Sequence, residues 1–474
     1  MTFTNALSNA ISGMNAATTA VQVRSHNIAN ATTEGYARRD VALASRKYGG
    51  VQIQSIERAG DTFALASRLT ADARSANLGL RAETLSQLNL AFGEPGDADG
   101  LFAAVSRFSS AIDDLALMPE AASFQQGAVT SAKDLVRTIN RLGDVVTSVR
   151  TDADANIAGS VAEVNSALKS LETLNRLSGE KELNGLSDIA EQRQQHINII
   201  SQALDIKVSP GRGGQVRITT AEGVVLLGER AQQIEFRSGG IVAPGHSMAS
   251  GHLSGLSVNG IDLTPGGGPQ GIRNGSIAGQ FAVRDEIAVD FGTRIDTFAD
   301  DLVARFADGA VDPTLAPGAQ GLFVDTGSGA GSASRLSVNA AVDPDQGGAL
   351  WRMRDGIGAT VPGPSAGTGV TQGLRLAISS ARPLAAVTDS PSSLGLIDTV
   401  GSLASVIGGR TVGAGAIAAA AASTANGLRD ADLAATGVNT DQELQSLLLI
   451  EQAYAANARV IQAVSDMMAR LLEI

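Results

Sequence analysis

Cysteine is absent from the 474 residues of this chain. Disulfide bridges, thiolate catalysis and zinc sites built on cysteine are therefore excluded. Aromatic residues make up only 3% of the sequence, with a single tryptophan, Trp351. Because large packed cores rely on aromatic rings, this scarcity favours a long helical protein with an aliphatic core.

Positive charge is also scarce. The formal net charge is −12, and no basic run occurs anywhere in the chain. Affinity for nucleic acid comes largely from Lys and Arg side chains that neutralise phosphates. The sequence therefore argues against nucleic acid as a partner, and anionic membrane surfaces are disfavoured for the same reason.

Long hydrophobic runs are missing as well. The first twenty residues, MTFTNALSNAISGMNAATTA, lack the positive n-region and continuous apolar core of a Sec-type signal peptide. The most apolar late stretch, 412–425, is dominated by alanine and is shorter than the ~20 residues that a membrane span needs. We expect neither a cleavable signal peptide nor a transmembrane helix.

Motifs that carry chemistry are missing too. Metal sites need several convergent ligands, but none of the histidines has partners at ligand spacing: His26, His196, His246 and His252. The paired aspartates at 97–99, 152–154 and 343–345 lack the other positions of a calcium loop. We interpret them as solvated turns or helix faces. Phosphate-binding loops are absent, so the sequence predicts no catalytic, cofactor-binding or metal-binding residues and no enzyme activity.

The placement of proline divides the chain. Eleven of the 13 prolines lie between Pro210 and Pro391. Proline breaks helices and fits poorly in central strands. Residues 1–94, 120–209 and 392–474 are therefore expected to be helical, and the middle is expected to be richer in turns and strands.

Both ends of the chain carry a heptad of apolar residues, and sustained spacing of three and four residues is typical of a coiled-coil seam. The N-terminal seam comprises Phe3, Leu7, Ala10, Met14, Ala17, Val21, Arg24 and Ile28. The C-terminal seam comprises Leu447, Ile450, Tyr454, Asn457, Ile461, Val464, Met468 and Leu471. Two polar residues, Arg24 and Asn457, occupy seam positions. They are either tolerated near a solvated break or set the register of the pair.

The N-terminal helix has an unusual surface. Arg24 is the one charged side chain in residues 1–33, and Gly13 weakens the helix by ~1 kcal/mol. A polar but uncharged helix face suggests packing against other subunits. We expect the two ends to be disordered or loosely paired in the free subunit and to become ordered on assembly, because their burial does not offset the entropy of ordering them.

Apolar spacing predicts further elements between the two ends. Helices are expected over 120–177, about 75 Å long if continuous, and over 276–307. Alternating residues around a glycine turn predict a β-hairpin over 206–227. Short alternating pieces such as RLSVNAAV and GLRLAISS suggest a small β-rich domain over 321–390.

Residues 27–39, NIANATTEGYARR, resemble the N-terminal signature N-x-x-N-x-x-T-x-G-Y-x-R of flagellar rod, hook and hook-associated proteins. The matching residues are Asn27, Asn30, Thr33, Gly35, Tyr36 and Arg38. Asparagine and glycine tolerate left-handed backbone conformations. The segment is therefore expected to end a helix and turn, with the ring of Tyr36 holding the turn.

The C-terminus resembles that of the same flagellar axial proteins. The matching residues are Gly437, Val438, Asn439, Glu443, Leu444, Gln452, Tyr454, Asn457 and Ile461. The stretch Thr440-Asp441-Gln442 departs from the commoner Leu-Asp-Glu form, and we expect Thr440 or Asp441 to cap the helix.

Interior segments 187–208, 275–306 and 336–344 resemble the hook-associated protein 1 family, which forms the junction between hook and filament. The resemblance implies a mainly α fold with β structure. It implies an inner coiled-coil domain (1–40 and 437–474), a helical rod domain with a hairpin near 206–228 (41–320 and 391–436), and a small outer β-rich domain (321–390).

The resemblance also implies a function and a set of partners. The chain is expected to be an extracellular structural subunit, exported without a cleavable signal peptide through the flagellar type III channel. Its implied partners are further copies of itself, the hook protein, the second hook–filament junction protein and an export chaperone. A different axial protein, such as the second junction protein or a hook or rod component, is the main alternative; a non-flagellar helical adhesin or secreted coiled coil would leave the two end motifs unexplained.

Overall fold

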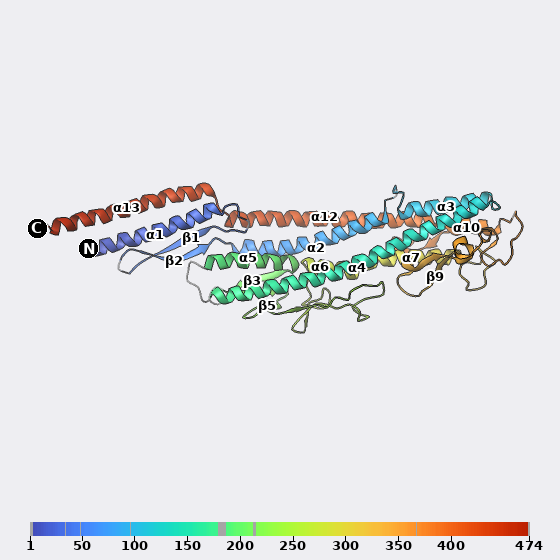
Figure 1. Cartoon of the computed structure of the whole chain (residues 1–474), viewed down its shortest axis with the longest axis horizontal. Helices are drawn as coiled ribbons and strands as arrows, with labels where there is room; N and C mark the ends of the chain where they lie inside the picture. Colours follow the sequence, from blue (N-terminus) through green and yellow to red (C-terminus); the bar gives the residue numbers. More distant parts are fainter. Residues whose placement is uncertain are drawn as a thin grey trace.

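The computed structural model describes residues 3–33, 35–47, 49–94, 96–178, 186–211, 215–365 and 367–472. The molecule is elongated, and both ends of the chain lie at the same end of it (Figure 1). The main helices are α1 (Phe3–Ala29), α2 (Thr62–Phe92), α3 (Leu101–Leu117), α4 (Ala122–Ser178), α5 (Leu186–Ala203), α6 (Ser276–Ala282), α7 (Ala288–Phe306), α10 (Gly369–Ser379), α12 (Leu396–Thr436) and α13 (Thr440–Leu472). Short helices are α8 (Ser332–Arg335), α9 (Arg352–Asp355) and α11 (Ala385–Thr388).

Strands are short and form small antiparallel sheets. The strands are β1 (Arg39–Ser45), β2 (Val51–Arg58), β3 (Ile206–Pro210), β4 (Val216–Thr220), β5 (Val225–Leu227), β6 (Ile234–Glu235), β7 (Ser257–Val258), β8 (Ile261–Asp262), β9 (Phe323–Asp325), β10 (Leu336–Val338), β11 (Arg382–Pro383) and β12 (Ser393–Leu394). The chain is thus mainly α with β structure and has paired terminal helices, which confirms the predicted fold class.

Helix α4 is the long axis of the rod, and its 57 residues extend for about 85 Å. One apolar core lies along its first half, where α3, α7, α10 and α12 meet. A second core lies along its second half, with α5, α6 and the sheet of β3, β4 and β5. The helix predicted over 120–177 is confirmed, since its apolar positions are the buried ones.

A buried ion pair lies where the two cores meet. Arg284 and Asp154 are both fully buried, and the guanidinium Nη1 lies 2.6 Å from the Asp154 carboxylate. Arg284 belongs to a π-helical turn, Val283–Ile287, that joins α6 to α7. We had interpreted Asp154 as part of a solvated helix face, and this is wrong. Its partner is 130 residues away in sequence, so no local pattern revealed it.

The hairpin predicted over 206–227 is confirmed as the pair β3–β4, and β5 adds a third strand within the same range. Ile206 pairs with Thr220 and Val208 with Ile218, and β5 then pairs with β4. Part of the predicted glycine turn, 212–214, lies outside the described residues. The helix predicted over 276–307 is also confirmed, with the π-helical turn as an interruption.

Two predictions about local structure are wrong. Residues 39–58, assigned to a helical tract, form the antiparallel pair β1–β2. Residues 373–379 of the predicted strand GLRLAISS belong to helix α10, because Val370, Leu374, Ala377 and Ile378 recur at helical spacing and are buried. Among the described residues of the 321–390 region, strands are limited to β9, β10 and β11, and the apolar side chains join the core of α3, α4 and α7.

Helix α12 lies alongside α2 for much of its length (Figure 1). By length and composition alone, one stretch of the described chain, within Leu396–Arg470, could cross a membrane. The expectation of no membrane-spanning helix is therefore not met by this length-and-composition criterion. Alanine supplies most of its apolar character between residues 412 and 425.

Candidate assembly interface at the paired termini

Helices α1 and α13 come from opposite ends of the sequence and lie side by side in antiparallel directions (Figure 1). Of the predicted seam residues, Ala10, Ala17 and Val464 are buried. The half-buried seam residues are Leu7, Met14, Val21, Arg24, Ile28, Leu447, Ile450, Asn457 and Ile461. Phe3, Tyr454 and Met468 remain exposed, and the side chain of Leu471 lies outside the described residues. The pair therefore forms, but much of its large apolar surface stays in solvent.

The hairpin of β1 and β2 covers another face of α1. Its turn lies against Asn9 and Ser12, and the Val51 amide donates to Ser12 Oγ at 3.1 Å. Gly49 and Gly50 have φ of 101° and 83°, and a β-carbon on Gly50 would stand 2.5 Å from Ser12 Oγ. Glycine is therefore required at Gly50 both by conformation and by the close approach to α1.

Asn27 joins four segments at the base of the helix pair. Its side chain is fully buried. The amide Nδ2 donates to the Arg39 carbonyl at 2.9 Å and to Glu443 Oε2 at 3.1 Å. The amide Oδ1 accepts from the Tyr36 hydroxyl at 2.9 Å and from the Arg39 amide at 3.0 Å. All four bonding positions of this amide are used, so only an asparagine side chain satisfies the surroundings.

An ion pair locks α13 to the same point. Arg24 on α1 donates to Glu443 on α13 at 3.0 Å and lies 2.8 Å from Asp40 on β1. Glu443 is 2% exposed, and Arg24 is 20% exposed. Arg24 is therefore a specific partner of α13. This geometry agrees with a register-setting role, which remains a hypothesis.

The other motif residues shape the two turns. Asn30 donates to the His26 carbonyl and accepts from the Thr33 hydroxyl, so it closes the end of α1. Gly35 has φ of 81°, which agrees with the expected left-handed turn. Gly437 follows α12, where a β-carbon would stand 2.5 Å from the Leu433 carbonyl oxygen.

The cap of α13 differs from the prediction. Asn439 Oδ1 accepts from the backbone amides of Asp441 at 3.0 Å and Gln442 at 3.2 Å. Asn439 is thus the N-cap, and the expectation that Thr440 or Asp441 caps the helix is wrong. Thr440 is already the first residue of α13, so it cannot be the cap that precedes the helix.

Ion pairs lie near the joint between the terminal helices and the rod. Arg39 lies 2.9 Å from Glu191 of α5, and Arg68 of α2 lies 3.1 Å from Asp432 of α12. Burial raises the pKa of Asp432, while the positive charges of Arg68 and Arg58 act against that rise. The Arg39 pair therefore joins the β1–β2 hairpin to α5 of the rod, and the Arg68 pair joins two rod helices to each other.

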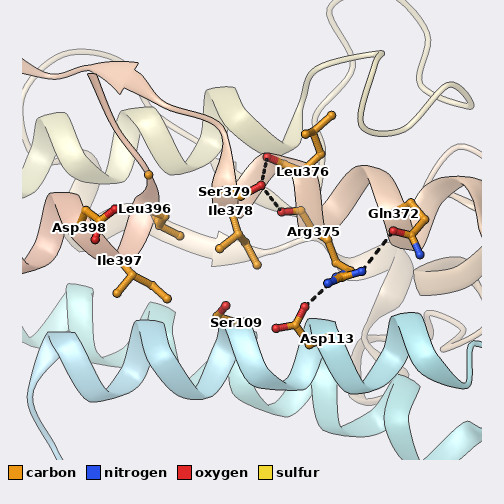
Figure 2. Close-up of a pocket in the computed structure, with 11 residues that line it drawn as sticks. Ser109, Asp113, Gln372, Arg375, Leu376, Ile378, Ser379, Leu396, Ile397 and Asp398 are labelled. Carbon is orange, nitrogen blue, oxygen red and sulfur yellow. Dashed lines mark hydrogen bonds and ion pairs between the residues drawn. The ribbon is translucent and has the colours of Figure 1, made fainter. Parts of the chain in front are cut away.

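A surface pocket at the opposite end of the rod is the other candidate site. It has a volume of about 610 Å³ and lies between α3, α10 and the start of α12. Figure 2 shows the side chain of Arg375 reaching toward Asp113 and Gln372. Its guanidinium donates to Asp113 Oδ1 at 2.7 Å and to Gln372 Oε1 at 3.4 Å. The guanidinium of Arg375 is therefore already paired within the protein. Within the described residues, no group of three or more His, Asp or Glu side chains is placed to bind a metal ion.

Three features at the termini were not predicted from sequence: the hairpin, the bonds of Ser12, and the convergence of Asn27 and Glu443. A signal for the hairpin was present. Val51 and Ile53 alternate with Gln52 and Gln54 directly after Gly49-Gly50, which is a hairpin pattern. Asn27 and Glu443 are 416 residues apart in sequence, so no local pattern places them together. The available signal was that each belongs to one of the two family motifs at the ends of the chain.

Two families match different parts of the chain. Residues 85–309 match "Flagellar hook-associated protein FlgK helical domain", and residues 433–474 match "Flagellar basal body rod FlgEFG protein C-terminal". The first region contains α3 to α7, and the second contains α13 with its cap. The resemblance inferred from the sequence is therefore confirmed.

Curated relatives point to the same family. The chain is 27% identical over 239 residues to flagellar hook-associated protein 1 of Bacillus subtilis, covering 47% of this chain and 47% of the relative. It is 25% identical over 242 residues to the protein of that name from Salmonella typhimurium, covering 48% of this chain and 43% of the relative. The matched stretch thus spans about half the length of each relative.

One solved structure is also similar, "The structure of the flagellar hook junction protein FlgK from Burkholderia pseudomallei". The sequence identity is 17% and the TM-score is 0.45, with 55% of this chain and 46% of that chain covered.

Proposed function

We propose, from its similarity to flagellar hook-associated protein 1, that this chain is a structural subunit that joins hook to filament by polymerising through α1 and α13. The role is mechanical and needs no chemical step. The observation that carries the proposal is the helix pair itself: two helices from opposite ends of the chain are locked at one end by Asn27 and Glu443 and leave large apolar side chains exposed along the rest.

The exposed apolar side chains support polymerisation. Phe3, Leu448 and Leu449 are 43%, 60% and 67% exposed. Burying one such side chain contributes about 1.5–3 kcal/mol. Exposed apolar patches rimmed by polar residues mark interaction sites, so a lattice of neighbouring subunits would stabilise this pair.

The proposed partners follow from the family. They are further copies of this chain, the hook protein, the second junction protein and an export chaperone. The protein would lie outside the cell in the flagellum, after export without a cleavable signal peptide. The interface would include the residues named from the sequence, with Asn27, Tyr36 and Asn439 holding the helices in place.

Immunolabelling of intact flagella tests the proposal. An antibody against the rod region should give a single band at the distal end of the hook. A strain that produces the chain without residues 1–33 should lose the band and shed its filaments, while the truncated protein remains folded by circular dichroism. Normal filament attachment in that strain would refute the proposal.

A hook or rod component is the second candidate, because residues 433–474 match the rod-protein C-terminal family. The same labelling separates the two. Label along the hook shaft or at the rod would favour the second candidate over a junction subunit.

A further inference from the structure

Arg58, the last residue of β2, carries a charge that the chain does not pair. The side chain is half-buried, and its Nε atom is buried without a hydrogen-bond partner. Among the residues that the structure describes, no hydrogen bond or ion pair reaches this guanidinium. Charged groups removed from water are normally paired, because desolvation is costly. The surroundings of Arg58 therefore lack an anionic partner.

Like charges lie beside Arg58. Arg39 stands directly opposite it in the β1–β2 pair, so the two side chains leave the hairpin on the same face, where like charges destabilise each other. Burial is the main cause that lowers the pKa of Arg58, and the positive charges of Arg39 and Arg68 add to that lowering. The negative charges of Glu191 and Asp432 act against it. An additional negative group at this point would therefore be attracted by three guanidinium groups.

The carboxylates near this guanidinium already serve other groups. Glu191 lies 2.9 Å from Arg39, and Asp432 lies 3.1 Å from Arg68. Asp61, which lies near Asp432, accepts hydrogen bonds from two backbone amides at the start of α2. Each carboxylate thus has a partner at hydrogen-bond or ion-pair distance, and the charge at the end of β2 is left unmatched.

The unmatched charge lies at the joint between the terminal helices and the rod. Strand β1 contacts α1, β2 contacts α5, and α2 follows β2 in the chain (Figure 1). Guanidinium groups bind carboxylate and phosphate through two parallel N–H donors. An anion held by Arg58 would therefore lie next to the hairpin on one side and next to Arg68 of the rod on the other.

We propose that Arg58, with Arg39 and Arg68 beside it, forms a site for one oxyanion, a phosphate or a carboxylate. We call these three residues the oxyanion site. Two sources can supply this chemistry: a free anion from solution, or an acidic side chain of a neighbouring protein. A nucleic acid does not fit, because the chain has a net charge of −12 and no basic run. The site belongs to the single chain and does not depend on the proposed function.

Phosphate binding to the free subunit tests the site. Calorimetric titration in a low-salt buffer without multivalent anions should show one phosphate bound per native chain. Arg58→Gln should weaken this binding at least tenfold. The matched control is Arg46→Gln, which removes an exposed arginine from the same hairpin and should bind as the native chain does. Absence of phosphate binding by the native chain, or equal binding by the two variants, would refute the site.

Unfolding in urea separates an anion site from an ordinary structural arginine. Without phosphate, Arg58→Gln should leave the urea midpoint unchanged or raise it, because it removes an unpaired charge. Phosphate should raise the midpoint of the native chain but not that of Arg58→Gln. Arg68→Gln should lower the midpoint in either buffer, because Arg68 donates to Asn198 at 2.8 Å and pairs with Asp432. If Arg58→Gln is as destabilising as Arg68→Gln without phosphate, Arg58 has a partner within the chain and the proposal is wrong.

Assembly distinguishes the two sources of the anion. If an acidic side chain of a neighbour fills the site, phosphate should inhibit polymerisation, and Arg58→Gln but not Arg46→Gln should raise the concentration needed at least tenfold. If an anion from solution fills it, the native chain and both variants should polymerise alike, and washed native polymer should retain phosphate. Equal polymerisation without retained phosphate would refute the site. Failure of the native chain to polymerise would remove the proposed function, whereas the phosphate titration of the free subunit would still decide the site.

Discussion

Gly13 of α1 lies directly against the side-chain amide of Asn457 on α13. A β-carbon at Gly13 would stand 2.7 Å from Asn457 Nδ2 and 2.9 Å from its Cγ and Oδ1. The amide is held in place because Nδ2 also donates to the Ala453 carbonyl at 3.0 Å. The glycine that weakens α1 as an isolated helix is therefore the residue that lets α13 approach at this register.

Gly13→Ala should weaken the pairing of α1 with α13. Alanine gains about 1 kcal/mol of helix propensity, but overpacking against the bonded amide costs about 1–3 kcal/mol. We expect a net loss of about 1 kcal/mol in pairing, measured as faster amide exchange over residues 21–29, the part of α1 nearest Asn27. Adding Asn457→Ala should restore exchange to the native rate or slower, because the obstructing amide is gone. No restoration in the double variant would contradict the contact.

Asn27→Asp should open the base of the pair although the two side chains have the same shape. The change removes the donor that serves the Arg39 carbonyl and Glu443, and places a second carboxylate beside a residue that is 2% exposed. An unsatisfied buried group costs about 1–3 kcal/mol. Trypsin cleavage after Arg38 and Arg39 should therefore become about 10 to 100 times faster. Asn15→Asp, at an exposed position of the same helix, is the control and should cleave at the native rate.

Glu443→Gln should have a milder effect at the same place. The amide can still accept from Asn27, but it loses the charge that pairs with Arg24 across the helices. Because Arg24 keeps Asp40 as a second partner at 2.8 Å, we expect a loss of about 1–2 kcal/mol, less than the 3–5 kcal/mol typical of breaking a buried pair. Trypsin cleavage after Arg38 reports it. If Glu443→Gln speeds trypsin cleavage more than Asn27→Asp does, the expectation that it is the milder substitution is wrong.

The long helices were predictable because local pattern decides them. In α4 the apolar residues recur at helical spacing for 57 residues, and the same residues are buried in the rod. Helix α10 was mistaken for a strand because its short sequence satisfies both alternating and helical spacing in part. Burial of Leu374, Ala377 and Ile378 against one core decided in favour of the helix, and that core consists of distant elements.

The candidate site was predictable only in part, for a related reason. The heptads identified the two helices that pair, but not which side of each stays exposed. That depends on the hairpin, which occupies the face of α1 that contains Ser12. Likewise, Asn27 was identified through a family motif, whereas its role depends on Glu443 and Arg39 converging on one amide.

Acid should destabilise the rod through carboxylates whose pKa is lowered in the folded state. The Arg354 guanidinium donates two hydrogen bonds to Asp355 and holds the pKa of that carboxyl below its ordinary value of 3.8. A carboxyl of this kind stabilises the fold above its unfolded pKa and loses that contribution as pH falls through its folded pKa. Asp355→Asn should therefore lower the unfolding free energy by about 1–2 kcal/mol at pH 7. In urea titrations the difference from the native protein should shrink below pH 3.8 and persist above it; a difference that is constant across this range would exclude a role for the ionised carboxylate.

The tips of α1 and α13 should be unprotected in the free subunit and protected after assembly. Three of the six buried residues of α1 are alanines, Ala10, Ala16 and Ala17, and a buried alanine contributes little apolar area. Ordering each backbone residue costs about 1–2 kcal/mol, so the pair should fray from the end farthest from Asn27. Hydrogen exchange followed by mass spectrometry should show fast exchange of residues 3–20 and 455–470 in the monomer, and at least a hundredfold slowing in the polymer. Amides in the middle of α4 serve as the control, because they should be protected in both states. Full protection of the tips in the monomer would mean that the pair is stable alone, and the exposed apolar side chains would then need an explanation other than subunit contacts.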